Sequence, residues 1–194
     1  MTTNPIPDWN AHGAIPPFDV RDPASANRSP YLTTLSDLVL RFGDNEKRRA
    51  ILAGFIRYRD FLHNLGMVRG FQWLDGSFLE YVELLETRHP NDLDVVTFFH
   101  LPDGLSQREL LAKDTNGWLT DRAKTKTEVN IDGYLVCLDT RADRLVKEST
   151  YWYSMWSHRR NQTWKGYVQV DLAPSGDVDA KAILDAEGDA GGVS

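Results

Sequence analysis

Two short motifs in the middle of the chain carry the residues best suited to chemistry. Gly76-Ser77 follows an apolar, aromatic run, and Asp92 and Asp94 stand one residue apart at the start of the run Leu93–Phe99. That run is rich in β-branched and aromatic residues, which predicts a buried strand. Side chains two apart on a strand share a face, so we expect Asp92 and Asp94 to point the same way.

Two carboxylates on one face of a strand predict a site for a divalent cation. Oxygen ligands suit Mg²⁺ or Mn²⁺, and Mg²⁺ keeps several waters and is completed by substrate phosphates. Two such ions can stabilise the attacking and leaving oxygens of an in-line displacement, so the chemistry indicated is phosphoryl or nucleotidyl transfer from a nucleoside triphosphate. In the simpler interpretation Asn91-Asp92 is a turn and Asp94 is a carboxylate at a strand edge.

The Gly-Ser pair lies between a predicted strand over Met67–Leu74 and a predicted helix over Phe78–Glu86. Glycine lets the backbone approach a ligand closely, and N–H groups at a helix start attract phosphate. We therefore expect Gly76 and Ser77 to contact the phosphates of a nucleotide.

The ordered combination of these motifs resembles the signature of the DNA polymerase beta-like nucleotidyltransferase superfamily. The resemblance implies that Asp92 and Asp94 bind two divalent cations, that the Gly-Ser turn contacts the triphosphate, and that a third acidic residue on a later strand completes the metal site. The chain resembles more closely an uncharacterised bacterial domain family, over most of residues 12–172. The matching segments are Arg28-Ser29-Pro30-Tyr31, Gly70–Phe78, Pro90–Val96 and Lys165-Gly166.

Three residues compete for the place of that third carboxylate. Asp132 lies in the strand candidate Glu128–Leu138, about where the superfamily's residue should fall, and we predict it as a third metal ligand or a general base. Asp171 has a similar local pattern, and Glu128 is a further candidate. In the simpler interpretation Asp132 is a strand residue that faces water.

A basic loop follows the aromatic segment Thr150–Ser157. Arg159, Arg160 and Lys165 place three cations within seven positions, and they could clamp phosphate, since arginine binds it in bidentate fashion. A plain hairpin loop is the alternative. In the aromatic segment Trp152, Met155 and Trp156 fall on one helical face, which suits core packing or stacking on a base.

The predicted fold class is α+β, a nucleotidyltransferase-like mixed β-sheet flanked by helices. We divide the chain into an extended N-terminal arm (1–29), the main domain (30–173) and an acidic, flexible tail in solvent (174–194). Within the tail Ala180–Leu184 could form one or two helical turns, and a partner protein could order the segment. The main domain opens with a helical hairpin, a short helix over 34–42 and a longer one from Asp44 to Gly66. Further elements are helices over 105–113 and 118–123 and a strand over 167–172.

Arginines on the longer helix of the hairpin have two interpretations. They form either a solvated face or a surface for an anionic partner: Arg48, Arg49, Arg57 and Arg59.

Composition limits the classes of partner and compartment. The net charge of −6 and a pI near 5.3 argue against an extended nucleic-acid-binding surface, because such binding neutralises many phosphates with Lys and Arg. The opening residues do not resemble a signal peptide, no apolar run approaches a membrane span, and the single Cys137 lies in an apolar run as a small core residue. We therefore expect a cytoplasmic protein that does not contact a membrane.

Two functions fit these observations. The first is a Mg²⁺-dependent nucleotidyltransferase that modifies a hydroxyl of a protein, an RNA or a small molecule; the resemblance implies a role in a toxin–antitoxin or phage-defence module, with a protein partner encoded nearby. The second is a catalytically inactive module of the same fold that senses nucleotide or binds a protein partner. In the superfamily's minimal, toxin–antitoxin-associated branch an arginine follows the Gly-Ser, whereas here Phe78-Leu79-Glu80 follows. This difference keeps the second function as the alternative to the first.

Overall fold

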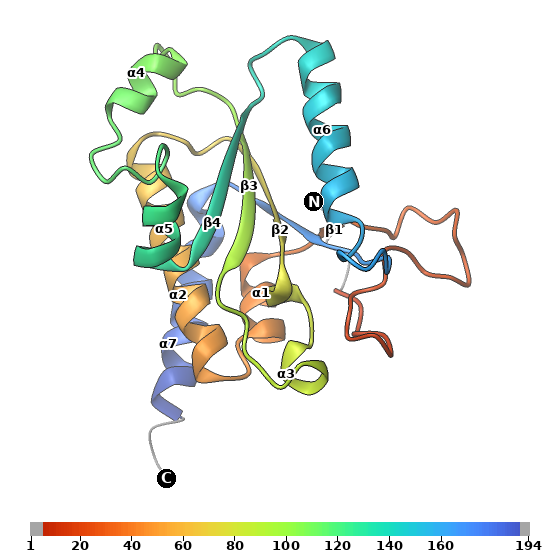
Figure 1. Ribbon diagram of the computed structural model, residues 1–194. Helices are drawn as coiled ribbons and strands as arrows, with labels where there is room; N and C mark the ends of the chain where they lie inside the picture. The colour runs from red at the N-terminus through yellow and green to blue at the C-terminus, as the bar shows by residue number, and fades with distance from the viewer. Residues whose placement is uncertain (1–5, 191–194) are drawn as a thin grey trace.

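The chain forms an α+β fold around one mixed, open β-sheet (Figure 1). A computed structural model describes residues 6–190, with side-chain burial for residues 6–186. The sheet has five strands in the order β1-β5-β2-β3-β4. β2 is antiparallel to both of its neighbours, while β3 and β4 run parallel, as do β1 and β5. The strands are β1 (Tyr31–Leu32), β2 (Gly70–Asp75), β3 (Leu93–Phe99), β4 (Ile131–Cys137) and β5 (Val168–Asp171).

Within the described residues seven α-helices flank this sheet, as the sequence predicted for the fold class. Four of them contact one another on one side: α1 (Leu35–Phe42), α2 (Glu46–Asn64), α5 (Arg122–Val129) and α7 (Asp177–Ala190). On the other side α6 (Ala142–Trp156) lies against β4 and against Tyr167, the residue before β5, through aromatic contacts (Figure 1). The short helices α3 (Val82–Leu85) and α4 (Gln107–Ala112) lie in the connections on either side of β3.

Local sequence signals explain the helical hairpin. Thr34 caps α1 by accepting a hydrogen bond from the Asp37 N–H, as predicted. Asn45 caps α2 in the same way by accepting from the Arg48 N–H, so the cap lies one residue after the predicted cap Asp44. The hairpin therefore starts and ends close to the expected positions.

Two arginines on α2 are buried, and for these both interpretations of the arginine face were wrong. Arg48 and Arg59 have 0% and 1% of their surface exposed. Arg59 donates to both carboxylate oxygens of Asp177, at 2.8 and 2.7 Å, and to the Gln72 side chain at 2.6 Å. Arg48 donates to Glu83 at 2.7 Å and to the Phe78 carbonyl at 2.6 Å. A buried guanidinium needs such partners, so these arginines join α2 to its neighbours.

The predicted acidic tail is part of the fold. Residues 174–176 form a 3₁₀ turn, η2, and α7 follows directly and packs on α1 and α2. Ala180 and Leu184 are buried, and Asp177 at the start of α7 forms the ion pair with Arg59. The prediction of a tail in solvent was wrong over 174–186, because this buried ion pair and the apolar face attach the helix. Residues 191–194 lie outside the described residues.

The N-terminal arm contacts the main domain. Its described part, residues 6–29, has no helix, and residues 1–5 lie outside the described residues. Trp9 stacks on Tyr81 with ring centroids 4.5 Å apart and donates a hydrogen bond to the Leu79 carbonyl at 2.7 Å. Ile15 is buried and accepts a hydrogen bond from the Gly166 N–H. The arm therefore covers the segment that follows Gly76-Ser77.

Two other expectations concern single features. Cys137 is a free, buried residue of β4, as predicted for a small core residue. Among the residues that the structure describes, no helix is both long and apolar enough to cross a bilayer.

Candidate functional site

Three aspartates from neighbouring strands lie in register at one end of the sheet. Asp94 on β3 pairs with Asp75 on β2 and with Asp132 on β4. Residues paired in this way have Cα atoms about 5 Å apart and side chains on the same face. Asp92 stands two residues before Asp94, just before β3 begins. We call Asp75, Asp92, Asp94 and Asp132 the carboxylate cluster.

Asp94 lies at the centre of the cluster. No ion pair to its carboxylate is formed within the described part of the chain, and its pKa is raised to about 6. Burial is the main cause, and the negative charges of Asp92 and Asp132 add to it, while Lys165 and Lys126 oppose it. A partly buried carboxylate beside two others favours a cation as a neighbour.

The glycine of the Gly-Ser turn makes room for Asp94. Gly76 has φ +87° and ψ −174°, a conformation that side-chain-bearing residues avoid. A Cβ at this position would stand 2.0 Å from Asp94 Oδ2. The sequence predicted that glycine permits close approach to the backbone at this position, and in the structure the approaching group is the Asp94 carboxylate.

The helix predicted directly after the turn is broken in two. Residues Ser77–Leu79 form a 3₁₀ turn, η1, and α3 covers only Val82–Leu85. Glu80 between them is extended, and its backbone carbonyl accepts a hydrogen bond from Arg48. The prediction of one helix over Phe78–Glu86 was wrong, since these contacts hold Glu80 out of the helical conformation.

A buried ion-pair network borders the cluster on the β2 side. Lys165 Nζ lies 2.9 Å from Asp75 Oδ1 and 3.0 Å from Glu80 Oε1. The pKa of Asp75 is raised to about 7: burial is the main cause, Lys165 opposes it, and the Asp94 charge adds a smaller contribution to the rise. Burial lowers the pKa of Lys165, but the two carboxylates outweigh this effect and raise it. Lys165 is therefore a cation held next to the carboxylate cluster.

Sequence reasoning missed Asp75, although it ends a strand and directly precedes Gly76. Its side chain shares the face of Asp94 because the two are register partners. The strand end before a Gly-Ser turn was the signal available in the sequence.

The predicted phosphate clamp is only partly assembled. Arg159 pairs with Glu80 at 2.8 Å, so Arg159 and Lys165 meet around the same carboxylate. Arg160 is exposed and forms no ion pair within the described residues. The segment is a hairpin, since His158 and Trp164 form an antiparallel bridge and the Arg159 N–H donates to the Thr163 carbonyl.

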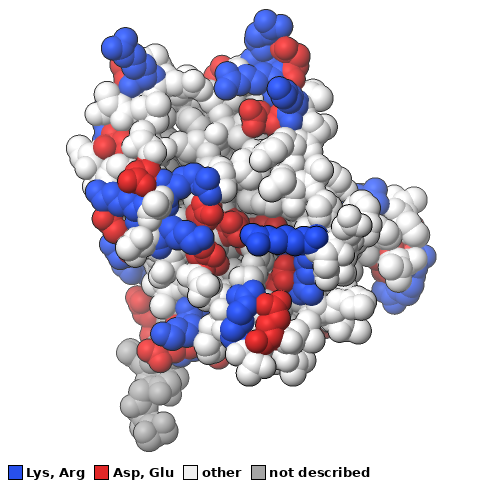
Figure 2. All heavy atoms as spheres, viewed as in Figure 1, with Lys and Arg blue, Asp and Glu red and all other residues white. Residues whose placement is uncertain are grey.

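Two cations from α5 hold the other side of the cluster. Arg122 Nε donates to Asp132 Oδ1 at 2.8 Å, and the guanidinium lies over the Tyr134 ring at 3.8 Å. Lys126 Nζ contacts Asp92 and lies 3.9 Å from Asp132 Oδ2. Figure 2 shows the result as acidic side chains near the middle of this face with basic side chains on both sides.

These cations were not predicted because α5 was misplaced. We expected a helix over 118–123 and a strand from Glu128, whereas α5 runs from Arg122 to Val129 and β4 starts at Ile131. Asp121 caps α5 by accepting from the Lys124 N–H, and this N-cap was the overlooked signal.

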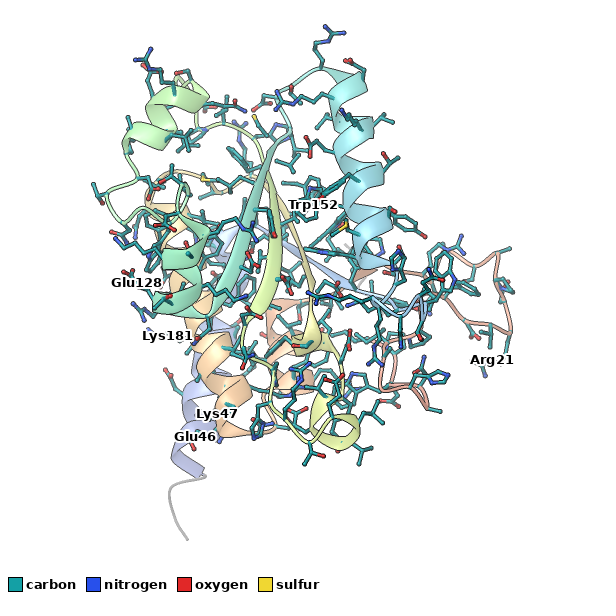
Figure 3. The ribbon with its side chains drawn as sticks, viewed as in Figure 1. Arg21, Glu46, Lys47, Glu128, Trp152 and Lys181 are labelled. Carbon is teal, nitrogen blue, oxygen red and sulfur yellow. The ribbon has the colours of Figure 1, made fainter. Side chains whose placement is uncertain are left out.

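Asp171 and Glu128, the other candidates for the third carboxylate, lie outside the carboxylate cluster. Asp171 pairs with Phe71 on β2, four residues from Asp75, or about 13 Å along the strand. Glu128 accepts a hydrogen bond from Trp118 Nε1 at 2.7 Å, and it points away from the sheet in Figure 3. Among the three candidates only Asp132 belongs to the carboxylate cluster.

The aromatic residues of α6 pack on the same face of the sheet. Trp152, labelled in Figure 3, lies between α6 and the sheet and contacts Tyr134 with ring centroids 4.5 Å apart. Trp152 and Trp156 are buried, whereas Met155 is 52% exposed. The two tryptophans therefore serve core packing, and Met155 does not share their environment.

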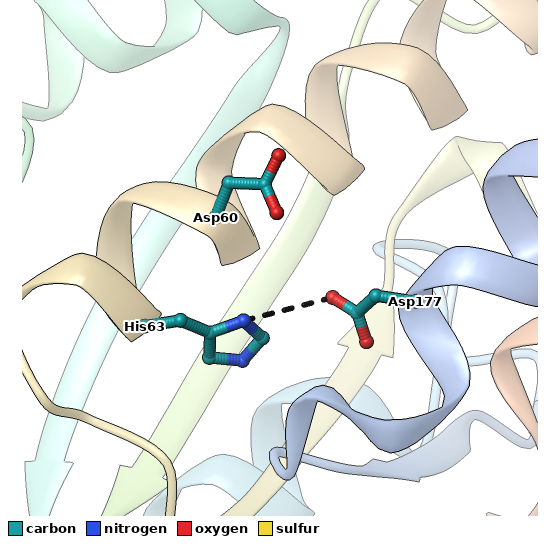
Figure 4. Close-up of side chains that lie close together, drawn as sticks. All are labelled: Asp60, His63 and Asp177. Carbon is teal, nitrogen blue, oxygen red and sulfur yellow. Dashed lines mark ion pairs between the residues drawn. The ribbon is translucent and has the colours of Figure 1, made fainter.

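A separate group of metal-ligand residues occurs on the opposite side of the sheet. Within the described residues, the only three-residue group with ligand atoms all within 4.8 Å of one another is Asp60, His63 and Asp177 (Figure 4). Asp177 is already bound by Arg59, and His63 Nε2 hydrogen-bonds to the Leu172 carbonyl. These contacts give the group a structural role in joining α2 to α7.

The carboxylate cluster does not meet that distance limit. Three of its carboxylates, Asp92, Asp94 and Asp132, nevertheless form a donor set that suits Mg²⁺ or Mn²⁺, while Asp75 stays paired with Lys165. The absence of a side chain at Gly76 leaves room for the Asp94 carboxylate. The residues present therefore fit such an ion, on the condition that the α5 side chains release Asp92 and Asp132.

One cavity of about 280 Å³ lies at the other end of the sheet, lined by Phe99 and Cys137 at the ends of β3 and β4 and by leucines of α4. Its lining is mainly apolar and includes none of the carboxylate cluster. We assign it no part in the candidate site.

Comparison with known proteins identifies a family. Residues 7–171 match DUF6932, which is described as a family of unknown function. The chain belongs to this family. The DUF6932 match contains the whole carboxylate cluster, the Gly-Ser turn and the basic hairpin. Searches of curated proteins and of solved structures found no match to the chain.

Proposed function

We propose that this DUF6932 chain is a metal-dependent nucleotidyltransferase with a nucleotidyltransferase-like fold. The observation that carries the proposal is the alignment of Asp75, Asp94 and Asp132 across three adjacent strands, with Asp92 beside them and Gly76 under Asp94. Carboxylates gathered on one face at a turn are the arrangement that binds a metal–triphosphate complex.

Each residue has a defined task in this proposal. Asp92 and Asp94 would hold Mg²⁺ or Mn²⁺, and the ion would neutralise charge on the triphosphate. Asp132 would complete the ligand set or take the proton of the attacking hydroxyl, since it lies on the neighbouring strand. Gly76 and Ser77 would border the phosphates, and Lys165 with Arg159 would offset charge on the departing pyrophosphate.

The acceptor class stays broad: the hydroxyl of a protein, an RNA or a small molecule. We retain the role in a toxin–antitoxin or phage-defence module, with a protein partner encoded nearby, as part of the proposal. It rests on the superfamily resemblance of the motifs alone.

A second function is favoured by one observation. Arg122 and Lys126 form ion pairs with two of the carboxylates that would bind metal, Asp132 and Asp92. The ligand atoms of the cluster do not all lie within 4.8 Å of one another, as those of Asp60, His63 and Asp177 do. A catalytically inactive module that binds a protein partner or senses nucleotide would keep such ion pairs permanently.

Labelling with radioactive nucleotide separates the two functions. The wild-type chain is incubated with each α-³²P-labelled nucleoside triphosphate, Mg²⁺ and a host-cell extract, beside Asp94→Asn. Transfer by the wild type that Asp94→Asn lacks, while its thermal unfolding is unchanged, supports the transferase. Equal labelling by the two proteins would refute it, and labelling by neither would favour the inactive module.

A further inference from the structure

The α5 cations and the acids they contact differ in exposure. The side chains of Arg122 and Lys126 are 50% and 51% exposed, while those of Asp132 and Asp92 are 15% and 13% exposed. The carboxylates thus form the floor of the site and the cations its rim. A basic side chain at a rim can swing into solvent at little cost, because half of it is already hydrated.

The attachment of α5 does not depend on these two side chains. Thr125 and Val129 are buried on the inner side of the helix, Asp121 caps its start, and Asn130 ends it in the left-handed conformation. Arg122 and Lys126 stand four residues apart, so they share one face of the helix, above the cluster. Their release would therefore leave the helix in place.

The balance of charge in the cluster indicates what Arg122 and Lys126 do. Asp92, Asp94 and Asp132 are three acidic side chains, and Arg122 and Lys126 are the two basic side chains of α5 that contact them. Among the described residues Asp94 forms no ion pair. A divalent cation that enters beside Asp94 competes with Lys126 for Asp92. Once displaced, the lysine and the arginine stand at the rim, where a triphosphate bound to that ion would lie.

We propose that Arg122 and Lys126 are exchangeable counterions: they hold the metal-binding carboxylates in the resting protein, a divalent cation displaces them, and they then bind the triphosphate. This inference rests on the proposed function and adds the residues that control metal entry and bind substrate. It places substrate-binding cations on α5, in addition to those of the 158–166 hairpin.

The exchange predicts that removing either cation has two opposite effects, one on the affinity for Mn²⁺ and one on the affinity for ATP. Mn²⁺ alone is titrated into the wild type, Lys126→Met and Arg122→Met, with free Mn²⁺ followed by electron paramagnetic resonance. Removing a competing cation should tighten Mn²⁺ binding by at least about threefold, the factor that corresponds to a partly exposed ion pair. At saturating Mn²⁺ the same variants should bind ATP at least about threefold more weakly.

The control lies on the same helix. Lys124 pairs with Glu128 at 3.9 Å and contacts none of the carboxylate cluster, so Lys124→Met should change neither affinity. The exchange is overturned, and the proposed function is left standing, if Asp94→Asn abolishes Mn²⁺ binding while Lys126→Met and Arg122→Met keep the wild-type affinities for Mn²⁺ and ATP. Absence of Mn²⁺ binding in the wild type and in both variants would overturn the inference together with the metal-dependent function.

Discussion

Gly76→Ala is the substitution whose effect the structure defines most closely. At φ +87° and ψ −174° a non-glycine residue is strained by about 1–3 kcal/mol. The new Cβ would also stand 2.0 Å from Asp94 Oδ2, whereas real Cβ atoms essentially never approach another atom within 3.0 Å. The Asp94 carboxylate must therefore move by about 1 Å or more. We expect the variant to lose both stability and metal affinity.

Gly104→Ala separates the two effects. Gly104 also has a positive φ, +77°, but nothing lies within 4 Å of a Cβ built there. Its substitution should cost only backbone strain, about 1–2 kcal/mol, and both variants share the lower chain entropy of alanine in the unfolded state. Gly76→Ala should therefore be less stable than Gly104→Ala by about 1 kcal/mol or more.

Urea unfolding measures the stability difference, and Mn²⁺ titration measures the state of Asp94. We expect Gly104→Ala to bind Mn²⁺ as the wild type does and Gly76→Ala to bind it at least about tenfold more weakly, which corresponds to about 1.4 kcal/mol. If Gly76→Ala matches Gly104→Ala in both measurements, then Asp94 is not held against the turn, and the reasoning about the cradle is wrong.

Two other substitutions test buried ion pairs of the fold. Glu83→Gln should lose about 1.5–3 kcal/mol at pH 7, because Arg48 is fully buried beside it. Burial raises the pKa of Glu83, but the Arg48 hydrogen bonds outweigh this effect and lower the pKa from 4.5 to about 2. The stabilisation by this pair is therefore complete above pH 4.5 and is lost as the pH falls toward 2. A stability difference between wild type and variant that does not shrink over this range would contradict the assignment. Asp177→Asn should lose about 3–5 kcal/mol in urea unfolding, since it leaves Arg59 buried with a weakened partner, and a loss below about 1 kcal/mol would show that this pair does not hold α7.

Much of the fold could be predicted from local patterns. The run Leu93–Phe99 formed the expected strand, and the Thr34 cap marked the start of α1. Such signals lie within a few residues of the element they define, so one sequence is sufficient to read them. The prediction of strands and flanking helices rested on these signals, the prediction of a mixed sheet came with the superfamily resemblance, and both were confirmed.

The elements that were wrong depend on contacts distant in sequence. Arg59 and Asp177 are 118 positions apart, and no local pattern shows that this pair brings the acidic segment onto α2. Arg48 and Glu80 are 32 positions apart, yet their contact accompanies the break in the helix predicted after the Gly-Ser turn. A buried ion pair overrides local propensity in the first case, and a buried hydrogen bond to a backbone carbonyl does so in the second.

The candidate site divides in the same way. The Gly-Ser turn and the Asp92, Asp94 pair could be found by spacing, and Asp132 by its place in a predicted strand together with the superfamily resemblance. Asp75 enters the cluster only through the register of β2 with β3, and Lys126 through the packing of α5. A register and a helix position are tertiary facts, which explains why these two residues were missed.

The central claim is that the carboxylate cluster binds a metal–nucleotide complex. Calorimetric titration of ATP, GTP, CTP and UTP with Mg²⁺ into the wild type, Asp94→Asn and Asp171→Asn tests it most directly. Asp171 is a matched control, an exposed aspartate of the same sheet at its opposite end. The account predicts Mg²⁺-dependent binding of at least one nucleotide by the wild type and Asp171→Asn, and its loss in Asp94→Asn. Equal binding by all three proteins, or no binding by any of them, would contradict the account.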